Sequence, residues 1–112
     1  MLTAHPKGQR VALFGGAFNP PHLAHLFTVT YLLSRSDIDE VWLIPSHRHV
    51  FNKQLLPFKH RVEFLEEMCS SLSNVRICRI EEEESLSGRT FDTIELLSSR
   101  WPNHRFSLVI GS

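Results

Sequence analysis

Short apolar runs alternate along the chain with longer segments in which apolar residues recur at helical spacing. The apolar runs predict four buried strands: Val11 to Phe14, Val41 to Ile44, Val75 to Ile80 and Phe106 to Ile110. Between them lie three segments with apolar side chains three and four residues apart, the spacing of an amphipathic helix. These segments are residues 23–33, 57–72 and 90–99. Strands alternating with helices in this way form right-handed βαβ units, so the sequence predicts an α/β fold with a parallel sheet covered on both faces.

Three polar segments follow the predicted strands at their carboxyl ends. They are the turn that begins at Gly15, the loop from Ser46 to Leu56 and the loop from Ser85 to Thr90. Ligands of open parallel sheets bind beyond the carboxyl ends of the strands, near the switch point after the first strand. We therefore expect the site where these loops meet. The acidic run Glu81 to Glu84 is interpreted as a solvated strand exit rather than a metal cage.

The segment from Gly15 to Leu26 combines several devices that bind phosphate. Gly15 and Gly16 allow a tight turn that brings backbone N–H groups near a ligand, and the positive N-terminus of the next helix can face an anion. His22 and His25 are three residues apart, so they share one face of the first helical turn. The combination predicts a nucleotide site, and the alternative is two incidental surface histidines.

These residues, Gly-Gly-Ala-Phe-Asn-Pro-Pro-His-Leu-Ala-His, resemble the nucleotidyltransferase superfamily with the His-x-Gly-His signature. They are most similar to the opening Gly-Gly-x-Phe-Asp-Pro-x-His-x-Gly-His of the nicotinate (or nicotinamide) mononucleotide adenylyltransferases. Asn19 stands where this family usually has Asp, and Ala24 where it usually has Gly. The resemblance implies a Rossmann-like nucleotidyltransferase fold, truncated after its fourth strand. Residues 1–112 would then form a single domain that is incomplete at its C-terminus.

The resemblance also implies a reaction. An adenylyl group would pass from ATP, accompanied by Mg²⁺, to nicotinate or nicotinamide mononucleotide, with release of pyrophosphate. The implied catalytic residues are His22, His25 and Lys53, the last aligned with the family's phosphate-contacting lysine. No resident metal site is implied. Contacts with the ATP phosphates fall to the turn residues Gly15, Gly16, Ala17, Phe18 and Asn19.

A second group of residues is assigned to the acceptor mononucleotide. Gly88-Arg89-Thr90-Phe91-Asp92-Thr93 resembles the family's Ser-Tyr-Thr-x-x-Thr-Leu segment, whose threonines contact the acceptor, so Thr90 and Thr93 are the implied contacts. Capping of the helix by Thr90 is compatible with this role. Arg61 resembles the basic residue at the start of the family's next helix and is the third implied contact. The alternative for Arg61 is a surface ion pair with Glu67 or a neighbouring carboxylate.

Composition narrows the class of protein. The 112 residues include 12 basic and 12 acidic ones, so no bulk field attracts nucleic acid or a membrane surface, and anion binding must be local. No apolar run approaches the roughly 20 residues that span a bilayer. The N-terminus lacks the apolar stretch of a signal peptide. Cys69 and Cys78 are interpreted as two buried thiols rather than a disulfide, which predicts a cytoplasmic protein.

Other functions remain open at this point. A metal-binding module would use the four imidazoles of His22, His25, His47 and His49, although no Cys or carboxylate completes a familiar zinc spacing. A nucleotide-binding fragment without turnover is another alternative, as is a different adenylyl- or cytidylyltransferase of the superfamily. For the 112-residue chain itself we expect poor or no adenylyl transfer. We also expect an apolar edge at the fourth strand, and therefore marginal stability or self-association into a homo-oligomer.

Overall fold

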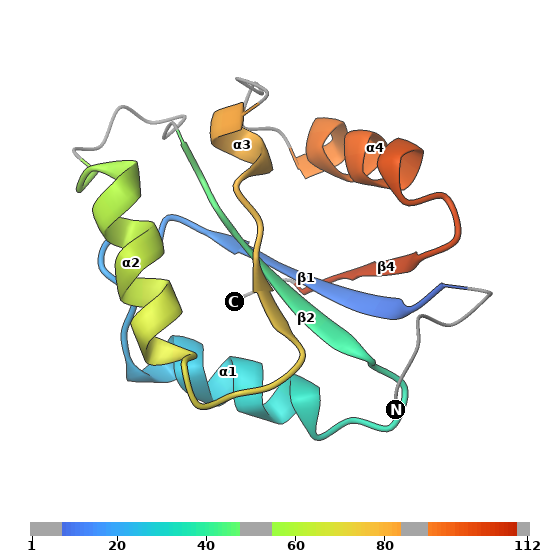
Figure 1. Ribbon diagram of the computed structural model, residues 1–112, viewed down its shortest axis with the longest axis horizontal. Coiled ribbons are helices and arrows are strands. Elements are labelled where there is room, and N and C mark those ends of the chain that lie inside the picture. Colours follow the sequence, from blue (N-terminus) through green and yellow to red (C-terminus); the bar gives the residue numbers. More distant parts are fainter. Residues whose placement is uncertain (1–7, 48–54, 84–89, 110–112) are drawn as a thin grey trace.

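A computed structural model describes residues 8–47, 55–83 and 90–109. Within these residues, four parallel strands form one sheet in the order β3-β2-β1-β4. The strands are β1 (Arg10–Gly16), β2 (Glu40–Pro45), β3 (Val75–Ile77) and β4 (Arg105–Leu108). The helices are α1 (Leu23–Leu33), α2 (Phe58–Met68), α3 (Ile80–Glu83) and α4 (Thr90–Arg100). Figure 1 shows α3 and α4 together on one side of the sheet and α1 on the other. The predicted α/β class, a Rossmann-like parallel sheet with flanking helices, is confirmed.

The two faces of the sheet have separate hydrophobic cores. Ala12 of β1 and Leu43 of β2 belong to the core under α1 and α2, with Val29 and Leu65 from the helices. The neighbouring strand residues point the other way, because successive side chains of a strand alternate between faces. The second core contains Val11, Leu13, Trp42, Ile80 and Leu97. Burial on both faces explains why the strands appear in the sequence as unbroken apolar runs.

Some predicted boundaries were wrong. The first helix has the predicted bounds, but β3 ends at Ile77 and β4 ends at Leu108, both earlier than predicted. Ile80 belongs to α3, where its buried side chain joins the second core. Glu81, also in α3, is 5% exposed, so the solvated strand exit is wrong for this residue. One turn of helix directly after β3 rotates Glu81 inward, which strand periodicity cannot anticipate.

Both cysteines are free thiols and both are buried, as predicted. Cys69 packs in the first core and Cys78 in the second. The chain thus places one thiol on each side of the sheet. No helix in the described part of the chain has the length and apolar character needed to cross a membrane.

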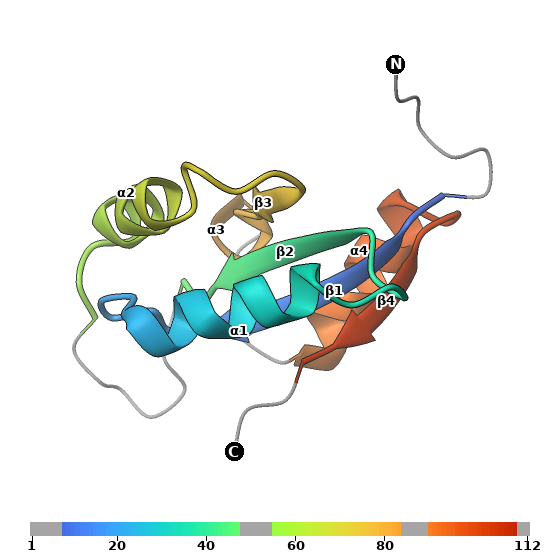
Figure 2. The same cartoon turned by 90° about the horizontal axis from the view of Figure 1, so that it is seen from below.

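The fourth strand lies next to the first, as predicted, and forms one edge of the sheet that the structure describes. Figure 2 shows β4 along the side of β1 that is remote from β2. Leu108 on this edge strand is 43% exposed. The predicted apolar edge is therefore present, and the self-association expected from it stays a prediction.

Candidate active site

The carboxyl ends of β1 and β2 lie side by side. Gly16 pairs with Pro45, and the Ser46 N–H donates to the Gly16 carbonyl at 2.9 Å. The turn after β1 and the loop after β2 therefore begin at the same point of the sheet edge, as predicted for the site. The third predicted segment, Ser85 to Thr90, lies mostly outside the described residues, and so does the whole of Lys53.

Gly15 and Gly16 are the last residues of β1, which corrects the expected glycine turn. The positive φ of this region, 48°, belongs to Phe18 instead. A Cβ atom at Gly15 would meet the Ile44 carbonyl oxygen at 3.7 Å, an ordinary contact. Gly15 is exposed, so the missing side chain leaves open backbone at the end of the strand. Glycine at this position therefore allows a ligand to approach the backbone closely, and the backbone conformation itself does not require it.

The buried ring of Phe18 packs against the turn that follows β1. Its side chain is 2% exposed, and its ring lies 3.4 Å from the position that a Cβ of Gly16 would occupy. The ring meets Phe14 edge to face at 5.4 Å and His25 at 4.8 Å between centroids. A left-handed conformation is unfavourable for a bulky residue, and here the packing of the ring holds it in place.

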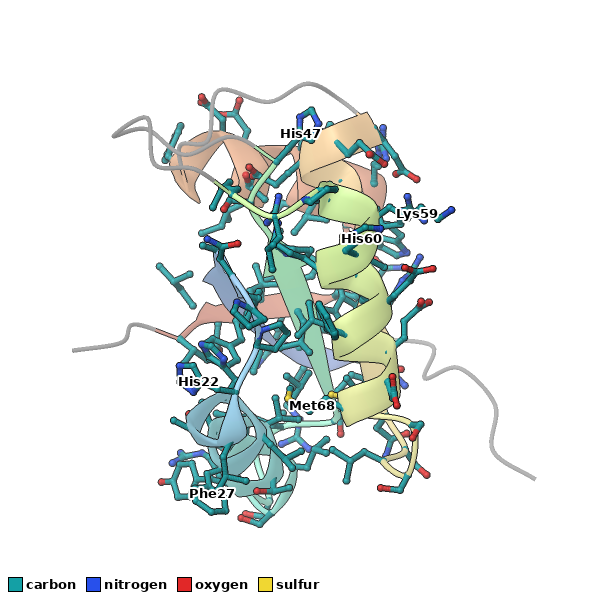
Figure 3. The ribbon with its side chains drawn as sticks, turned by 90° about the vertical axis from the view of Figure 1, so that its left-hand side faces the viewer. His22, Phe27, His47, Lys59, His60 and Met68 are labelled. Carbon is teal, nitrogen blue, oxygen red and sulfur yellow. The ribbon has the colours of Figure 1, made fainter. Side chains whose placement is uncertain are left out.

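His22 and His25 form a reciprocal cap at the beginning of α1. The Nδ1 atom of His22 accepts from the Ala24 N–H at 3.3 Å, and the Nδ1 atom of His25 accepts from the His22 N–H at 2.9 Å. The two rings stack at 3.9 Å between centroids. Because each Nδ1 accepts a hydrogen bond, a neutral ring holds its proton on Nε2. The cap therefore leaves two Nε2–H groups as donors. Figure 3 shows His22 at the start of α1.

The electrostatics of His25 favour the neutral ring. Burial lowers the pKa of His25 below its usual value of 6.5, and the neighbouring His22 lowers it further. A neutral imidazole is therefore the main form near pH 7. Such a ring can donate to a phosphate oxygen while Nδ1 stays in the cap.

Arg61, in the first turn of α2, is 1% exposed. Its Nε donates to the Leu56 carbonyl at 2.8 Å, and its Nη1 donates to the carbonyls of Ala17 at 2.9 Å and Ser46 at 2.6 Å. Burial lowers the pKa of this guanidinium. The alternative of a surface ion pair with Glu67 is wrong, because the side chain points into the protein. The same enclosure leaves the guanidinium with almost no surface open to a ligand, and the implied contact with a mononucleotide stays a prediction.

Asn19 makes a second connection between the turn and the loop. Its Oδ1 accepts from the Leu56 N–H at 2.7 Å. The side chain is exposed at the surface of the turn, so it is also within reach of solvent. An amide oxygen thus closes the turn onto the segment that leads into α2.

Thr93 is 4% exposed, and its hydroxyl donates to the buried carboxylate of Glu81. The contact joins α4 to α3. Thr90 is the first residue of α4, and its side chain lies outside the described part. The sequence does not indicate Glu81 as a partner for Thr93.

The sequence did carry one signal that Arg61 is buried. Arg61 lies three residues after Phe58 and four before Leu65, both buried, so it occupies an apolar position of the helix.

The histidines of the metal-binding alternative do not gather into a cluster within the described residues. Among residues 8–47, 55–83 and 90–109, no group of three or more His, Cys, Asp or Glu side chains is placed to hold a metal ion. His47 lies edge to face with Phe58 at 5.5 Å, beside the start of α2 (Figure 3). His49 falls outside the described residues.

Several known proteins are similar to this chain. A probable nicotinate-nucleotide adenylyltransferase of Myxococcus xanthus is 51% identical over 104 residues, covering 92% of this chain and 55% of the relative. A protein of the same description from Anaeromyxobacter sp. (strain K) is 42% identical, covering 94% of this chain and 58% of the relative. The Bacillus subtilis nicotinate-nucleotide adenylyltransferase is 33% identical, covering 93% and 56%. The chain spans about half the length of the curated relatives it matches.

Two solved structures have the same fold. A putative nicotinate-nucleotide adenylyltransferase from Vibrio parahaemolyticus superposes with a TM-score of 0.75 at 29% identity, covering 93% of this chain and 58% of that one. The Plasmodium falciparum nicotinic acid mononucleotide adenylyltransferase complexed with NaAD gives a TM-score of 0.82 at 21% identity, covering 92% and 52%. The family model described as cytidylyltransferase-like matches residues 13–111. Because this match spans almost the whole sequence, the chain belongs to the cytidylyltransferase-like family.

Proposed function

We propose that this chain forms the catalytic part of a nicotinate-nucleotide adenylyltransferase, which acts in NAD biosynthesis. The observation that carries the proposal is the capping pair His22 and His25, which leaves two Nε2–H donors beside the open backbone of Gly15. Similarity to the Myxococcus xanthus relative, named as a probable nicotinate-nucleotide adenylyltransferase, supports nicotinate mononucleotide as the acceptor. Nicotinamide mononucleotide is the alternative acceptor.

In the proposed reaction, an oxygen of the mononucleotide 5′-phosphate attacks the α-phosphorus of ATP. A new P–O bond forms, the bond from the α-phosphorus to the oxygen bridging to the β-phosphate breaks, and pyrophosphate leaves. The attacking phosphate is already an anion, so the step needs no base. Catalysis then depends on alignment of the two phosphates and on stabilisation of the charge that develops between them.

On the ATP side, His22 and His25 donate from Nε2 to phosphate oxygens and to the departing pyrophosphate. The backbone of a five-residue segment receives the α-phosphate region: Gly15, Gly16, Ala17, Phe18 and Asn19. Lys53 adds a positive charge from the loop. Mg²⁺ would arrive with ATP as part of the substrate and would neutralise part of the phosphate charge.

On the acceptor side, Thr90 and Thr93 at the start of α4 contact the mononucleotide. The Thr93 hydroxyl donates to the Glu81 carboxylate, which fixes this side chain at the start of α4. The positive end of α4 favours the phosphate of the mononucleotide. Arg61 acts on the site through the main-chain carbonyls of Ala17 and Ser46.

We also propose a cytoplasmic protein that forms a homo-oligomer. Two free, buried thiols fit a reducing compartment. The exposed apolar residue on the edge strand β4, Leu108, fits association between copies. Sedimentation of the purified chain tests the oligomer, and a monomer at micromolar concentration contradicts it.

Binding and turnover together test the proposed activity. Calorimetric titration of the chain should detect NaAD and ATP with Mg²⁺, and CTP with Mg²⁺ should bind more weakly. A protein that joins residues 1–112 to the second half of the Myxococcus xanthus relative should release pyrophosphate from ATP when nicotinate mononucleotide is present. Release with CTP but not with ATP would contradict adenylyl transfer. Absence of turnover with every pyridine mononucleotide would remove the substrate assignment.

A matched pair of variants locates the phosphate contact. Gly15→Ala adds a methyl group that meets only ordinary contact, so the fold should persist while ATP binding weakens. Gly16→Ala adds the same methyl group against the Phe18 ring and should reduce the affinity for ATP less than Gly15→Ala does. Equal ATP affinity in the wild type and in Gly15→Ala would place the phosphates elsewhere.

A further inference from the structure

The guanidinium of Arg61 is buried, which is unusual for a charged side chain. Each hydrogen bond found for it among the described residues goes to a main-chain carbonyl, and the three carbonyls lie 5, 15 and 44 positions away along the chain. In the described part of the chain Arg61 forms no ion pair, and burial of a cation without an anionic partner is costly, so its hydrogen bonds to the carbonyls must offset that cost. Arginine differs from other side chains in offering five donors in a rigid planar fork. The fork here reaches three separate segments at once.

The carbonyls that Arg61 binds determine where two peptide N–H groups point. In a trans peptide the C=O and the following N–H point in opposite directions. With the Ala17 carbonyl turned to the guanidinium, the N–H of Phe18 is directed away from it. The Ser46 carbonyl fixes the N–H of His47 in the same way. The Leu56 carbonyl precedes Pro57, which has no N–H, so that contact only anchors the start of α2.

These contacts also close the two ends of the loop between β2 and α2. Ser46 begins this loop and Leu56 ends it, and Arg61 binds the carbonyls of both. Two further hydrogen bonds tie the same ends to the turn after β1: Ser46 N–H to the Gly16 carbonyl, and Leu56 N–H to Asn19 Oδ1. Lys53 lies between these two anchored ends in the sequence.

We propose that Arg61 is a positioning residue, which locks the turn after β1 to both ends of the β2–α2 loop and so orients the Phe18 and His47 N–H groups toward substrate phosphate. The proposal rests on the proposed function for its substrate, whereas the locking itself is independent of any activity. Arg61 then acts through the backbone and touches neither ATP nor the mononucleotide. Its charge, held just behind the turn, adds to the attraction for an anion.

Hydrogen exchange on the 112-residue chain tests the locking directly. Arg61→Lys keeps the charge but loses the fork, so the Ser46 and Leu56 amides should exchange about tenfold faster or more, while the remote Asp39 and Val41 amides change by less than about twofold. The matched control is Arg76→Lys, which alters an arginine packed over the rings of Trp42 and Trp101. It should leave Ser46 and Leu56 unchanged.

Acceleration of exchange confined to α2, or equal acceleration of all four amides in Arg61→Lys, would overturn the proposal.

A second measurement needs no variant. In the wild-type chain the Nε–H of Arg61 should give an NMR signal that exchanges at least about tenfold more slowly than that of the exposed Arg76. NaAD should shift this signal less than it shifts the Phe18 and His47 amides. A larger shift at the guanidinium would mean direct ligand contact and would also overturn the proposal.

Kinetics separate positioning from binding. In the joined protein described above, Arg61→Lys should lower kcat by about tenfold or more and leave the KM for nicotinate mononucleotide within about threefold. A raised KM with unchanged kcat would identify a substrate contact and contradict positioning. If the wild-type protein shows no transfer, the proposed function fails, and the exchange measurements still decide the role of Arg61.

Discussion

The two ends of the sheet are held together by different interactions. Toward the amino ends of the strands, rings pack on one another: the Trp42 ring lies 5.0 Å from Trp101, 5.4 Å from Phe106 and 5.8 Å from His104. Arg76 covers this cluster, 4.8 Å above Trp42. At the carboxyl ends, rings also pack, as Phe18 does on Phe14, but the segments are tied together by hydrogen bonds to main-chain groups from Arg61, Asn19 and the histidine cap. Apolar area stabilises the first end, and directed polar contacts orient the second.

Histidine makes the same hydrogen bond at both ends. His104 accepts from the Gln9 N–H at its Nδ1, 3.1 Å away, as His22 and His25 accept from main-chain N–H groups in the cap. The surroundings differ. His104 is stacked among aromatic rings, whereas His22 is exposed beside open backbone. Similar hydrogen bonds therefore serve packing at one end and leave Nε2 donors for a ligand at the other.

The largest expected effect is the loss of stability when the aromatic cluster at the amino ends of the strands is disrupted. Trp42→Ala should lower the free energy of unfolding by about 3–5 kcal/mol, because the ring is fully buried. Phe91→Ala removes a ring that is 71% exposed and should stay within about 0.5 kcal/mol of the wild type. Urea unfolding measures both. A loss below about 1 kcal/mol in Trp42→Ala would mean that the aromatic cluster does not stabilise the sheet.

The next largest effect is on turnover, when the histidine cap at the carboxyl ends of the strands, the polar end of the sheet, is changed. His25→Ala should reduce turnover of the joined protein by about two orders of magnitude or more, since removing one transition-state donor costs about 3–4 kcal/mol. His25→Gln retains an acceptor for the His22 N–H and should recover most of the stability without the turnover. Pyrophosphate release and urea unfolding are the two measurements. Unchanged turnover in His25→Ala would remove His25 from catalysis.

A smaller effect is expected at Thr93. Thr93→Val keeps the volume but removes the donor to buried Glu81, which should cost about 1–3 kcal/mol of stability. It should also weaken binding of nicotinate mononucleotide more than binding of ATP. Adding Glu81→Gln removes the buried charge and should restore part of the stability. Equal weakening of both substrates would indicate general loosening of α4.

Periodicity predicted the helices and strands because each buries one clear apolar stripe or run. It located α1 to the residue and predicted that the turn after β1 and the loop after β2 begin side by side. Arg61 and Glu81 were misjudged for the opposite reason: charged residues are assigned to the surface unless a partner is visible, and their partners are distant in sequence. Backbone carbonyls leave no signature in a sequence at all. The shift of positive φ from glycine to Phe18 depends on ring packing and was equally invisible.

The smallest effect is the pH dependence that the histidine cap introduces. The pKa of His25 in the folded protein lies below its usual value of 6.5, so between these two values the unfolded chain binds more protons than the folded one. Stability from this residue is therefore complete above about pH 6.5 and is lost as the pH falls through the folded pKa. Protonation of Nδ1 also removes the acceptor for the His22 N–H. The urea midpoint should fall further between about pH 7.5 and about pH 5.5 for the wild type than for His25→Gln, which lacks this imidazole. Equal losses in the two proteins would show that His25 does not control the acid sensitivity of the polar end.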